Sequence, residues 1–549
     1  MRYRTKVLIV LLASVLGAAG CRQAPDKIVP QQARTPSTDG APRRGGTVVT
    51  GWPSEPAGVN YLLFPNNQPT NEMLFRVFLH LVEEQSDFQE HPPTMAPLLA
   101  SSYDWSPDHK TLTFHLRDNA VWSDGVPVTA DDVRWTWQAQ IDPDVAWDNA
   151  DAKRWITDVE VADPRTVRFH FSRVYAKQLL DANEGMILPK HAWEKLPFKQ
   201  WRQNSDWFKK TLVFDGPFVI ASWTPQQEIV LQRNEHFYDK RFPYLDRVVM
   251  RLVPDQASLF TQLLSGDLDF VPQVAVSDVP RAKASPRLQL INYWFNIYVA
   301  IGWNNDHPLF KDPEVRRALT LAIDRKTIVD TVLGPYGRVA TSPILTSVWA
   351  HDRTIQPWPY DPAEARRILE SKGWKDTDGD GVLDKGGKPF AFELITNTGN
   401  QLRADTMVMV QDQLKKVGIR AEPRPVEFNS MVAQVTSGKY DATLLGYSMD
   451  TSLDMSGAFH SHSIGDGAND VHYRNAEVDR LIDLAASQPD VQAEKPYLDQ
   501  IQQIIHREQP LTFLWESQRL TGVDKRVRNV KPTPAFSMFN VKEWWLAPS

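Results

Sequence analysis

Residues 111–137 read TLTFHLRDNAVWSDGVPVTADDVRWTW, and strand, turn and helix signals follow one another in this stretch without a gap. Apolar and polar residues alternate over residues 112–117, with Leu112, Phe114 and Leu116 on the same side. This alternation is the period of a half-buried strand. We therefore expect the stretch to begin with a strand that presents one face to a hydrophobic core.

A turn and then a helix follow this strand. Ser123, Asp124 and Gly125 predict a tight turn, because glycine adopts a positive φ without steric cost. Thr129 is the expected N-cap of the helix, with Asp132 three residues later in place of the usual Glu or Gln of a capping box. By itself the block fits any scaffold that mixes strands and helices.

Length and composition indicate a large globular protein. The chain has 549 residues, of which 42% are hydrophobic and 23% charged, enough for two or more hydrophobic cores. Its formal net charge is −6 at pH 7, and removal of residues 1–20, which carry three basic and no acidic side chains, makes the net charge −9. This balance lacks the basic surface of nucleic-acid-binding proteins, so we expect no nucleic-acid partner.

The N-terminus has the pattern of a bacterial lipoprotein. Residues 1–20 start with basic side chains, continue with an apolar run and end in Ala18-Ala19-Gly20, directly before the single cysteine, Cys21. This arrangement resembles a lipobox and predicts cleavage before Cys21 and its lipidation, which anchors the protein to a membrane. Residues 21–43 predict a flexible tether, because few of them are apolar. A plain secreted protein and an uncleaved short anchor are the alternatives.

Helix signals are also clear in the second half of the chain. Asp312-Pro313 begins a predicted helix that ends before Gly334, and Asp361-Pro362 begins another that ends before Gly373. Residues 407–417 predict a third. SGDLDF at residues 265–270 and SGKYDA at residues 437–442 each follow an amphipathic helix and lead into a strand, which suggests equivalent αβ units in two lobes.

The run HLRDNAVWSDGVPVTADDV, residues 115–133, closely resembles the signature of the family 5 extracellular solute-binding proteins, the peptide-binding subunits of ABC importers. Similarity to that family continues in DGPFVIASW (215–223), HPLFKDPEVRRALTLAIDRKTIVDTVLG (307–334), KYDATLLGYSMD (439–450) and NAEVDRLIDLA (475–485). Several motifs in the expected order carry the resemblance, which runs from about residue 44 to the C-terminus.

The resemblance implies an α/β, bilobal periplasmic-binding-protein fold of type II, the large peptide-binding class, with an extra subdomain inserted in the first lobe. We expect the first lobe to comprise residues 44–80, 191–300 and 516–549, the inserted subdomain residues 81–190 and the second lobe residues 301–515. The resemblance also implies a monomer on the periplasmic or cell-surface side of the membrane. Such a protein closes its lobes on a peptide and delivers it to a membrane permease driven by a separate ATPase.

The candidate ligand site is Gly446-Tyr447-Ser448-Met449-Asp450, directly after a predicted strand. In α/β sheets, ligands lie beyond the carboxyl ends of strands. In peptide-binding members of the family the matching pattern is Gly-Trp-x-x-Asp, whose Asp binds the α-ammonium of the peptide, and the resemblance implies this role for Asp450. Tyr447 replaces the Trp here, and the Asp-Pro that often follows is absent. A metal chelate, a sugar or another small molecule is the alternative ligand.

An acidic loop, DTDGDGVLD at residues 376–384, has the spacing of a Ca²⁺ loop. The position of the usual bidentate Glu is occupied by Gly387, so the affinity should be modest. A structural Ca²⁺ site and an ion-free solvated hairpin are equally open, and we expect no other cofactor. The candidate ligands are Asp376, Asp378, Asp380, Val382 and Asp384.

Other chemistry has weaker support in the sequence. His460, His462 and His472 form a second metal candidate, but their spacing is poor and loops of this composition are usually solvated. A nucleophile elbow, a Walker A loop, a dinucleotide fingerprint and an HExxH motif are all absent from the sequence. We therefore expect a binding protein without enzymatic activity, and a secreted hydrolase is the alternative from another class.

Overall fold

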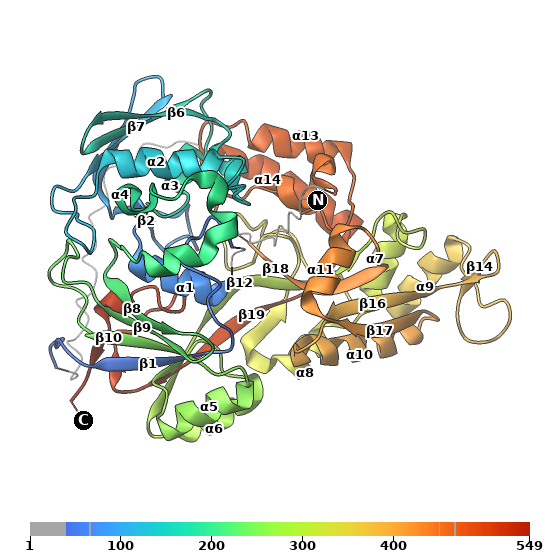
Figure 1. Ribbon diagram of the computed structural model, residues 1–549. Helices are drawn as coiled ribbons and strands as arrows, with labels where there is room; N and C mark the ends of the chain where they lie inside the picture. The colour runs from blue at the N-terminus through green and yellow to red at the C-terminus, as the bar shows by residue number, and fades with distance from the viewer. Residues whose placement is uncertain (1–39, 65–66, 450, 466–467, 549) are drawn as a thin grey trace, which may run out of the picture.

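A computed structural model describes residues 40–64, 67–449, 451–465 and 468–548. One mixed sheet of eleven strands organises it. These strands are Thr47–Trp52 (β1), Phe218–Thr224 (β8), Glu228–Arg233 (β9), Arg247–Leu252 (β10), Phe270–Val271 (β11), Leu288–Trp303 (β12), Gly337–Val339 (β13), Ala391–Asn397 (β16), Arg420–Val426 (β17), Ala442–Ser448 (β18) and Leu511–Asp524 (β19). Their order is β17-β16-β18-β12-β19-β11-β1-β10-β9-β8, with β13 beside β19 (Figure 1).

Helices pack around this sheet in both lobes (Figure 1). The first lobe, around β1 and β8–β11, carries Gln68–Val77 (α1), Ala130–Ile141 (α2), Gln178–Asn183 (α3), Lys190–Trp193 (α4), Gln256–Ser265 (α5) and Val279–Ala284 (α6). The second lobe, around β16–β18, carries Pro313–Leu321 (α7), Arg325–Val332 (α8), Pro362–Ser371 (α9), Gln401–Lys415 (α10), Phe428–Thr436 (α11), Ser456–Phe459 (α12), Ala476–Ala485 (α13) and Val491–Glu508 (α14).

The long strands β12 and β19 belong to both lobes and connect them. They pair with each other in antiparallel orientation over most of their length, and the register shifts between Trp294 and Tyr298 of β12. An irregular pairing of this kind bends a strand locally, so we expect the hinge between the lobes here. The predicted lobe boundaries, 300/301 and 515/516, fall inside these two strands, and the exact division of the chain stays a prediction.

The stretch 111–137 forms the strand, turn and helix expected from it. Leu112 and Phe114 are fully buried in Thr111–Leu116 (β5), and Gly125 turns the chain with φ +89°. At the start of α2 the Asp132 carboxylate accepts hydrogen bonds from the Thr129 backbone N–H (2.8 Å) and hydroxyl (3.1 Å). The predicted cap at the helix N-terminus is thereby confirmed.

This stretch belongs to a second sheet that packs into the first lobe. Its strand order is β4-β5-β7-β6, where β4 is Ala100–Trp105, β6 is Ile156–Asp163 and β7 is Thr166–Phe171. One hydrophobic core joins Val48 of β1 to Phe114 and Phe169 of this sheet. The description of residues 81–190 as an inserted subdomain therefore stays a prediction. The remaining short strands are Val82–Glu84 (β2), Met95–Pro97 (β3), Asp384–Lys385 (β14), Lys388–Pro389 (β15), Val527–Arg528 (β20) and Trp545–Leu546 (β21).

The prediction of one helix between Asp312 and Gly334 is wrong, because α7 ends at Leu321 and α8 begins at Arg325. The Asp324 carboxylate accepts hydrogen bonds from the backbone N–H of Thr327 (3.0 Å) and from its hydroxyl (2.7 Å). An aspartate in this role caps a new helix, so it interrupts a pattern that is otherwise continuous. The other two predictions hold, although α10 begins six residues before the expected residue 407.

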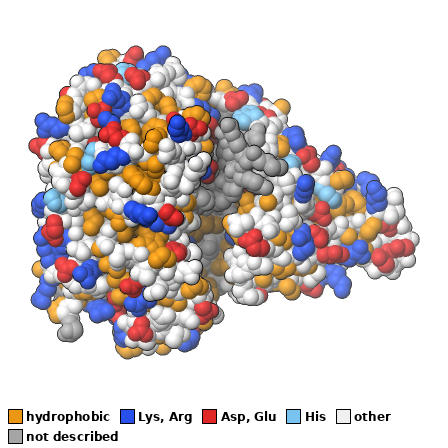
Figure 2. Space-filling model, viewed as in Figure 1, with side chains coloured by type: hydrophobic (Ala, Val, Ile, Leu, Met, Phe, Trp, Pro, Cys, Tyr) orange, Lys and Arg blue, Asp and Glu red, His pale blue; other side chains and the backbone are white. Residues whose placement is uncertain are grey.

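Three features concern association with a membrane: the surface charges, the apolar character of the helices and the N-terminal segment. Acidic and basic side chains are interspersed over the face shown in Figure 2. Among the described residues, no helix combines the length and the apolar character that a bilayer span requires. Cys21 and the signal segment lie outside the described residues, so cleavage, lipidation and tethering stay predictions.

Candidate functional site

A cavity of about 920 Å³ lies where the two lobes meet. This volume is in the range of small-molecule sites, roughly 300 to 1,000 Å³. The first lobe contributes residues of α1 and β2 and residues between 148 and 184 to its wall, and β12 contributes residues 295–297. The second lobe completes this part of the wall with Ser448, Thr451, Ser452, Asp454, Ser456 and Gly457. Because both lobes and the hinge strand line the cavity, movement of the lobes changes its access.

Direct contacts join the lobes beside the cavity. The hydroxyl of Thr451 donates a hydrogen bond to Glu84 Oε2 (2.6 Å). Lys177 Nζ lies 3.9 Å from Asp454 Oδ2, and both residues line the cavity. Phe88, which follows β2, packs into the hydrophobic core of the second lobe. The structure therefore has the lobes closed against each other.

Asp454 is an acidic residue of the cavity wall with a lowered pKa. Burial alone raises the pKa of its carboxyl, but the Lys177 ammonium and hydrogen bonds from Ser456 outweigh that effect and lower the pKa to about 2. The carboxylate is thus charged at physiological pH, and Lys177 of the other lobe balances its charge. The pair stabilises the closed arrangement, since the two charges separate when the lobes part.

The structure places the predicted ligand residues in different environments. Ser448 lines the cavity. Tyr447 and Met449 are buried in the core of the second lobe, where the Tyr447 ring stacks on Tyr298 with 5.5 Å between ring centroids. The Tyr447 ring is therefore not part of the cavity wall, because β18 turns this face toward the interior. Asp450 lies outside the described residues, and its role stays a prediction.

Gly446 has a packing role behind the cavity. A Cβ atom on Gly446 would lie 2.5 Å from Nη2 of Arg403, which is too close for any other side chain without a shift of the arginine. Arg403, near the N-terminus of α10, donates a hydrogen bond from Nη1 to Asn397 Oδ1 (2.8 Å). Burial lowers the pKa of Arg403 to about 10, and Tyr447 offsets part of this effect. Glycine is thus needed for the guanidinium to approach the strand.

Cationic and aromatic side chains that the sequence analysis did not single out also line the cavity. Arg76 of α1 and Arg519 of β19 are both part of its wall. The guanidinium carbon of Arg519 lies 3.5 Å from the ring centroid of Phe295, and that of Arg76 lies 5.4 Å from the ring centroid of Phe536. The alternation of side chains in β19 places Arg519 on one face of the strand, but no local pattern marks it as a wall residue.

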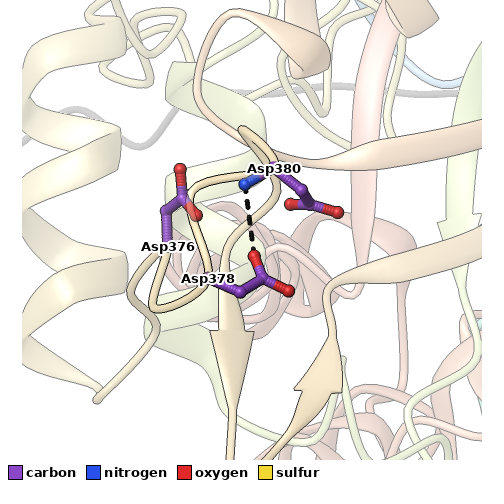
Figure 3. Close-up of side chains that lie close together, drawn as sticks. All are labelled: Asp376, Asp378 and Asp380. Carbon is purple, nitrogen blue, oxygen red and sulfur yellow. Dashed lines mark hydrogen bonds between the residues drawn. The ribbon is translucent and has the colours of Figure 1, made fainter.

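The acidic loop brings together three of its five candidate ligands (Figure 3). One carboxylate oxygen from each of Asp376, Asp378 and Asp380 lies within 4.8 Å of the others, and all three residues are exposed. The Asp384 carboxylate is not in this group. It accepts hydrogen bonds from the backbone N–H (2.9 Å) and the hydroxyl (2.6 Å) of Thr377.

The three histidines do not converge on one point. The rings of His460 and His462 have centroids 3.9 Å apart, but His472 Nδ1 lies 2.8 Å from a carboxylate oxygen of Asp306. In the part of the chain that the structure describes, the acidic loop is the one group of His, Cys, Asp or Glu side chains with metal-compatible spacing.

Comparison with known proteins agrees with this architecture. The family "Bacterial extracellular solute-binding proteins, family 5 Middle" matches residues 94–470. The oligopeptide-binding protein AppA of Bacillus subtilis (strain 168) is 33% identical over 516 residues, which are 92% of this chain and 93% of AppA. The structure of AppA in complex with a nonapeptide has a TM-score of 0.81 at 32% identity and covers 92% of this chain and 100% of that chain.

Other relatives are similar over nearly the same length. Heme-binding protein A of Haemophilus influenzae is 24% identical over 555 residues, 97% of each chain. The structure of NikZ from Campylobacter jejuni in complex with Ni(L-His) has a TM-score of 0.79 at 25% identity and covers 91% of this chain and 99% of that chain. Since the family match covers more than half of the chain and AppA is similar over more than nine tenths of it, this protein belongs to the bacterial extracellular solute-binding proteins of family 5.

Proposed function

We propose that this protein is the peptide-binding subunit of an ABC importer. It captures a di- or oligopeptide between its lobes and delivers it to a membrane permease that a separate ATPase drives. The observation that carries the proposal is the cavity of about 920 Å³ between the closed lobes. The similarity to AppA over nearly the whole chain favours a peptide over another solute. Lipidated Cys21 would hold the monomer outside the cytoplasm.

Lobe closure accounts for this function without any covalent chemistry or cofactor. A ligand stabilises the closed state only if it binds that state better than the open one. The closed cavity surrounds its contents with groups of both lobes, whereas the open form would offer one lobe at a time. The contacts Thr451–Glu84 and Lys177–Asp454 stabilise the closed state. The ligand therefore has to supply only the rest of the free energy that favours closing over opening.

Identification of the natural ligand tests the proposal. The purified protein is denatured mildly, and the small molecules it releases are identified by mass spectrometry and titrated back by calorimetry. We expect a mixture of short peptides with free amino ends. Release of a single non-peptide compound, such as a metal chelate or a porphyrin, would mean that the natural ligand is that solute and not a peptide. Cleavage products that accumulate with time would indicate a hydrolase instead.

We propose that Asp450 binds the α-ammonium of the peptide. Asp450→Asn is then expected to weaken binding about tenfold or more, since a charged hydrogen bond contributes about 1.5 to 3 kcal/mol. Asp412→Asn on the exposed side of α10 is the matched control and should leave the affinity unchanged. Calorimetric titration with a released peptide measures both variants. Equal affinity of Asp450→Asn and the unmodified protein would remove Asp450 from the site.

We further propose that Asp376, Asp378 and Asp380 hold Ca²⁺ weakly and in a structural role. Three exposed carboxylates without the bidentate Glu resemble the weakest Ca²⁺ modules, with dissociation constants on the order of 10⁻⁴ to 10⁻³ M. Calcium at ten times that constant should therefore raise the unfolding midpoint slightly, and Asp378→Asn should abolish the increase. Peptide affinity should be the same with calcium and with a chelator. A midpoint that calcium does not change would favour the ion-free hairpin.

A further inference from the structure

We propose that Arg519 and Arg76 form a carboxylate-binding end of the cavity. The proposal rests on the peptide-binding function above and assigns a part of the ligand to residues of the first lobe and the hinge. The ligand group is a carboxylate, supplied either by the C-terminus of the peptide or by an Asp or Glu side chain within it. Four observations on the two guanidinium groups support it: their position, their unused donors, their charge and their setting.

Arg519 lies beside the hinge and faces the cavity. It stands on β19 opposite Tyr293 of β12, and its guanidinium carbon lies 3.5 Å from the ring centroid of Phe295. Its Nε is buried and has no hydrogen-bond partner among the described residues. No carboxylate of those residues lies within ion-pair distance of Arg519. The Tyr293 hydroxyl accepts a hydrogen bond from one of the five N–H donors of the guanidinium, while Nε is left without a partner.

Arg76 completes the same end of the cavity from α1. Its Nη1 donates to the carbonyl oxygen of Phe539 (3.0 Å), while Nε and Nη2 have no hydrogen-bond partner among the described residues. Nη2 is 3.6 Å from a carboxylate oxygen of Glu72, which is an ion pair without a short hydrogen bond. Arg76 is buried, with 6% of its surface exposed. Each arginine thus lines the cavity and keeps at least one N–H donor without a hydrogen-bond partner among the described residues.

The charges at this end do not balance within the protein. Glu72 is the carboxylate that acts on both guanidinium groups, and its oxygens already accept hydrogen bonds from Ser537 and Met538. Glu83, which also lines the cavity, pairs with Lys542 at 3.3 Å. Glu83 also acts on Arg76, so three cations, Arg76, Arg519 and Lys542, lie beside two carboxylates at this end. Burial lowers the pKa of Arg519, which reflects the cost of holding a cation here, and a ligand anion would offset that cost.

The setting favours a planar, organic anion over a hydrated inorganic one. Phe75, Phe295, Phe536 and Phe539 surround the two arginines in the cavity wall. A carboxylate matches the fork geometry of a guanidinium in a bidentate way and carries an apolar residue that the phenyl rings can cover. A peptide whose end or side chain reaches this point satisfies both requirements.

The test uses the full-length chain in detergent and four peptide libraries, each ranging from dipeptides to decapeptides. The libraries combine a free or an amidated C-terminus with the presence or absence of Asp and Glu. Retained peptides are measured by mass spectrometry for the unmodified protein, Arg519→Gln, Arg519→Lys and the control Arg366→Gln, an exposed arginine of α9. The unfolding midpoint of each variant shows whether it is folded.

We expect Arg519→Gln to retain carboxylate-bearing peptides at least tenfold less well than the unmodified protein, Arg519→Lys to recover part of the loss, and Arg366→Gln to show none. Amidated peptides without acidic residues should bind the unmodified protein and Arg519→Gln equally. A loss limited to free C-termini identifies the C-terminal carboxylate as the group bound. A loss that persists in amidated peptides with Asp or Glu identifies an acidic side chain.

Two results would overturn the assignment. Equal retention of all four libraries by Arg519→Gln and the unmodified protein would mean that the arginine binds no ligand group. An equal loss in all four libraries, including the amidated peptides without acidic residues, would mean that Arg519 only shapes the cavity. Failure of the unmodified protein to retain any library would instead overturn the peptide function itself, and this assignment with it.

Discussion

Glu72→Gln is expected to lower the free energy of unfolding by about 3 to 5 kcal/mol, the usual cost of breaking a buried ion pair from one side. Glu72 is completely buried in α1. One of its oxygens accepts hydrogen bonds from the backbone N–H and the hydroxyl of Ser537, both 2.5 Å long, and the other accepts one from the backbone N–H of Met538 (3.1 Å). Equilibrium denaturation with urea measures the change.

The physical reason is that glutamine keeps the shape of the side chain but loses its charge and one acceptor. At least one backbone N–H of the C-terminal segment would then face an amide NH₂ instead of an oxygen, and a buried unsatisfied donor costs about 1 to 3 kcal/mol. Arg76, whose Nη2 is 3.6 Å from Glu72, would lose the carboxylate that balances it. Both effects act in the same direction, and both loosen the contact between α1 and residues 537–538.

The matched control is Glu370→Gln on the surface of α9. Arg366 and Glu370 form the same kind of pair four residues apart, with 3.2 Å between Nε and Oε1, but about half of each side chain is exposed. Exposed helix pairs contribute about 0.3 to 0.5 kcal/mol, so the control should be nearly as stable as the unmodified protein. If Glu72→Gln were equally mild, Glu72 would not hold the C-terminal segment against α1.

Local elements could be predicted from the sequence because their signals lie within a few residues of one another. Thr129 and Asp132, three residues apart, cap α2. Asp361 caps α9 in a similar way, because its carboxylate accepts a hydrogen bond from the backbone N–H of Glu364. The prediction of one helix in place of α7 and α8 failed because the local pattern there is continuous. Asp324 lies within an amphipathic pattern, and only its hydrogen bond to Thr327 reveals that a second helix begins there.

The cavity could not be predicted in the same way, because its wall combines distant segments. Arg76 meets Phe539 across more than four hundred residues of sequence, and Glu84 meets Thr451 across more than three hundred. Tyr447 shows the second difficulty. A strand that is buried on both faces has no polar alternation, so only its register with Tyr298 of β12 shows that the ring points into the core.

Glu494→Gln is expected to change the pH dependence of stability by on the order of 2 kcal/mol between pH 5 and pH 8. Glu494 of α14 is buried, and neither of its carboxylate oxygens has a hydrogen-bond partner among the described residues. Burial raises its pKa from 4.5 to about 7, and the repulsion of Asp454, Asp490 and Asp181 adds to this effect, while Lys177 offsets part of it.

The sign follows from proton linkage. Between pH 4.5 and pH 7 the folded protein keeps the proton on Glu494, whereas the unfolded chain releases it. The folded state therefore binds more protons in this window, so the free energy of unfolding falls as the pH rises through it and becomes level above pH 7. Glutamine cannot titrate, and the variant should lose this part of the slope. Relative to the unmodified protein, it gains stability as the pH increases.

Only the difference between the two pH profiles isolates Glu494, because burial also raises the pKa values of Asp181 and Asp470 to about 7. Asp470 titrates in both proteins and cancels in the difference, and Asp181 cancels except for its repulsion with Glu494, which belongs to the Glu494 effect. Urea denaturation at a series of pH values provides this difference. Parallel profiles would mean that Glu494 is ionised in the folded protein at pH 5. That result would require a cation close to it, and Lys177 of the other lobe would then have to pair with Glu494 rather than with Asp454.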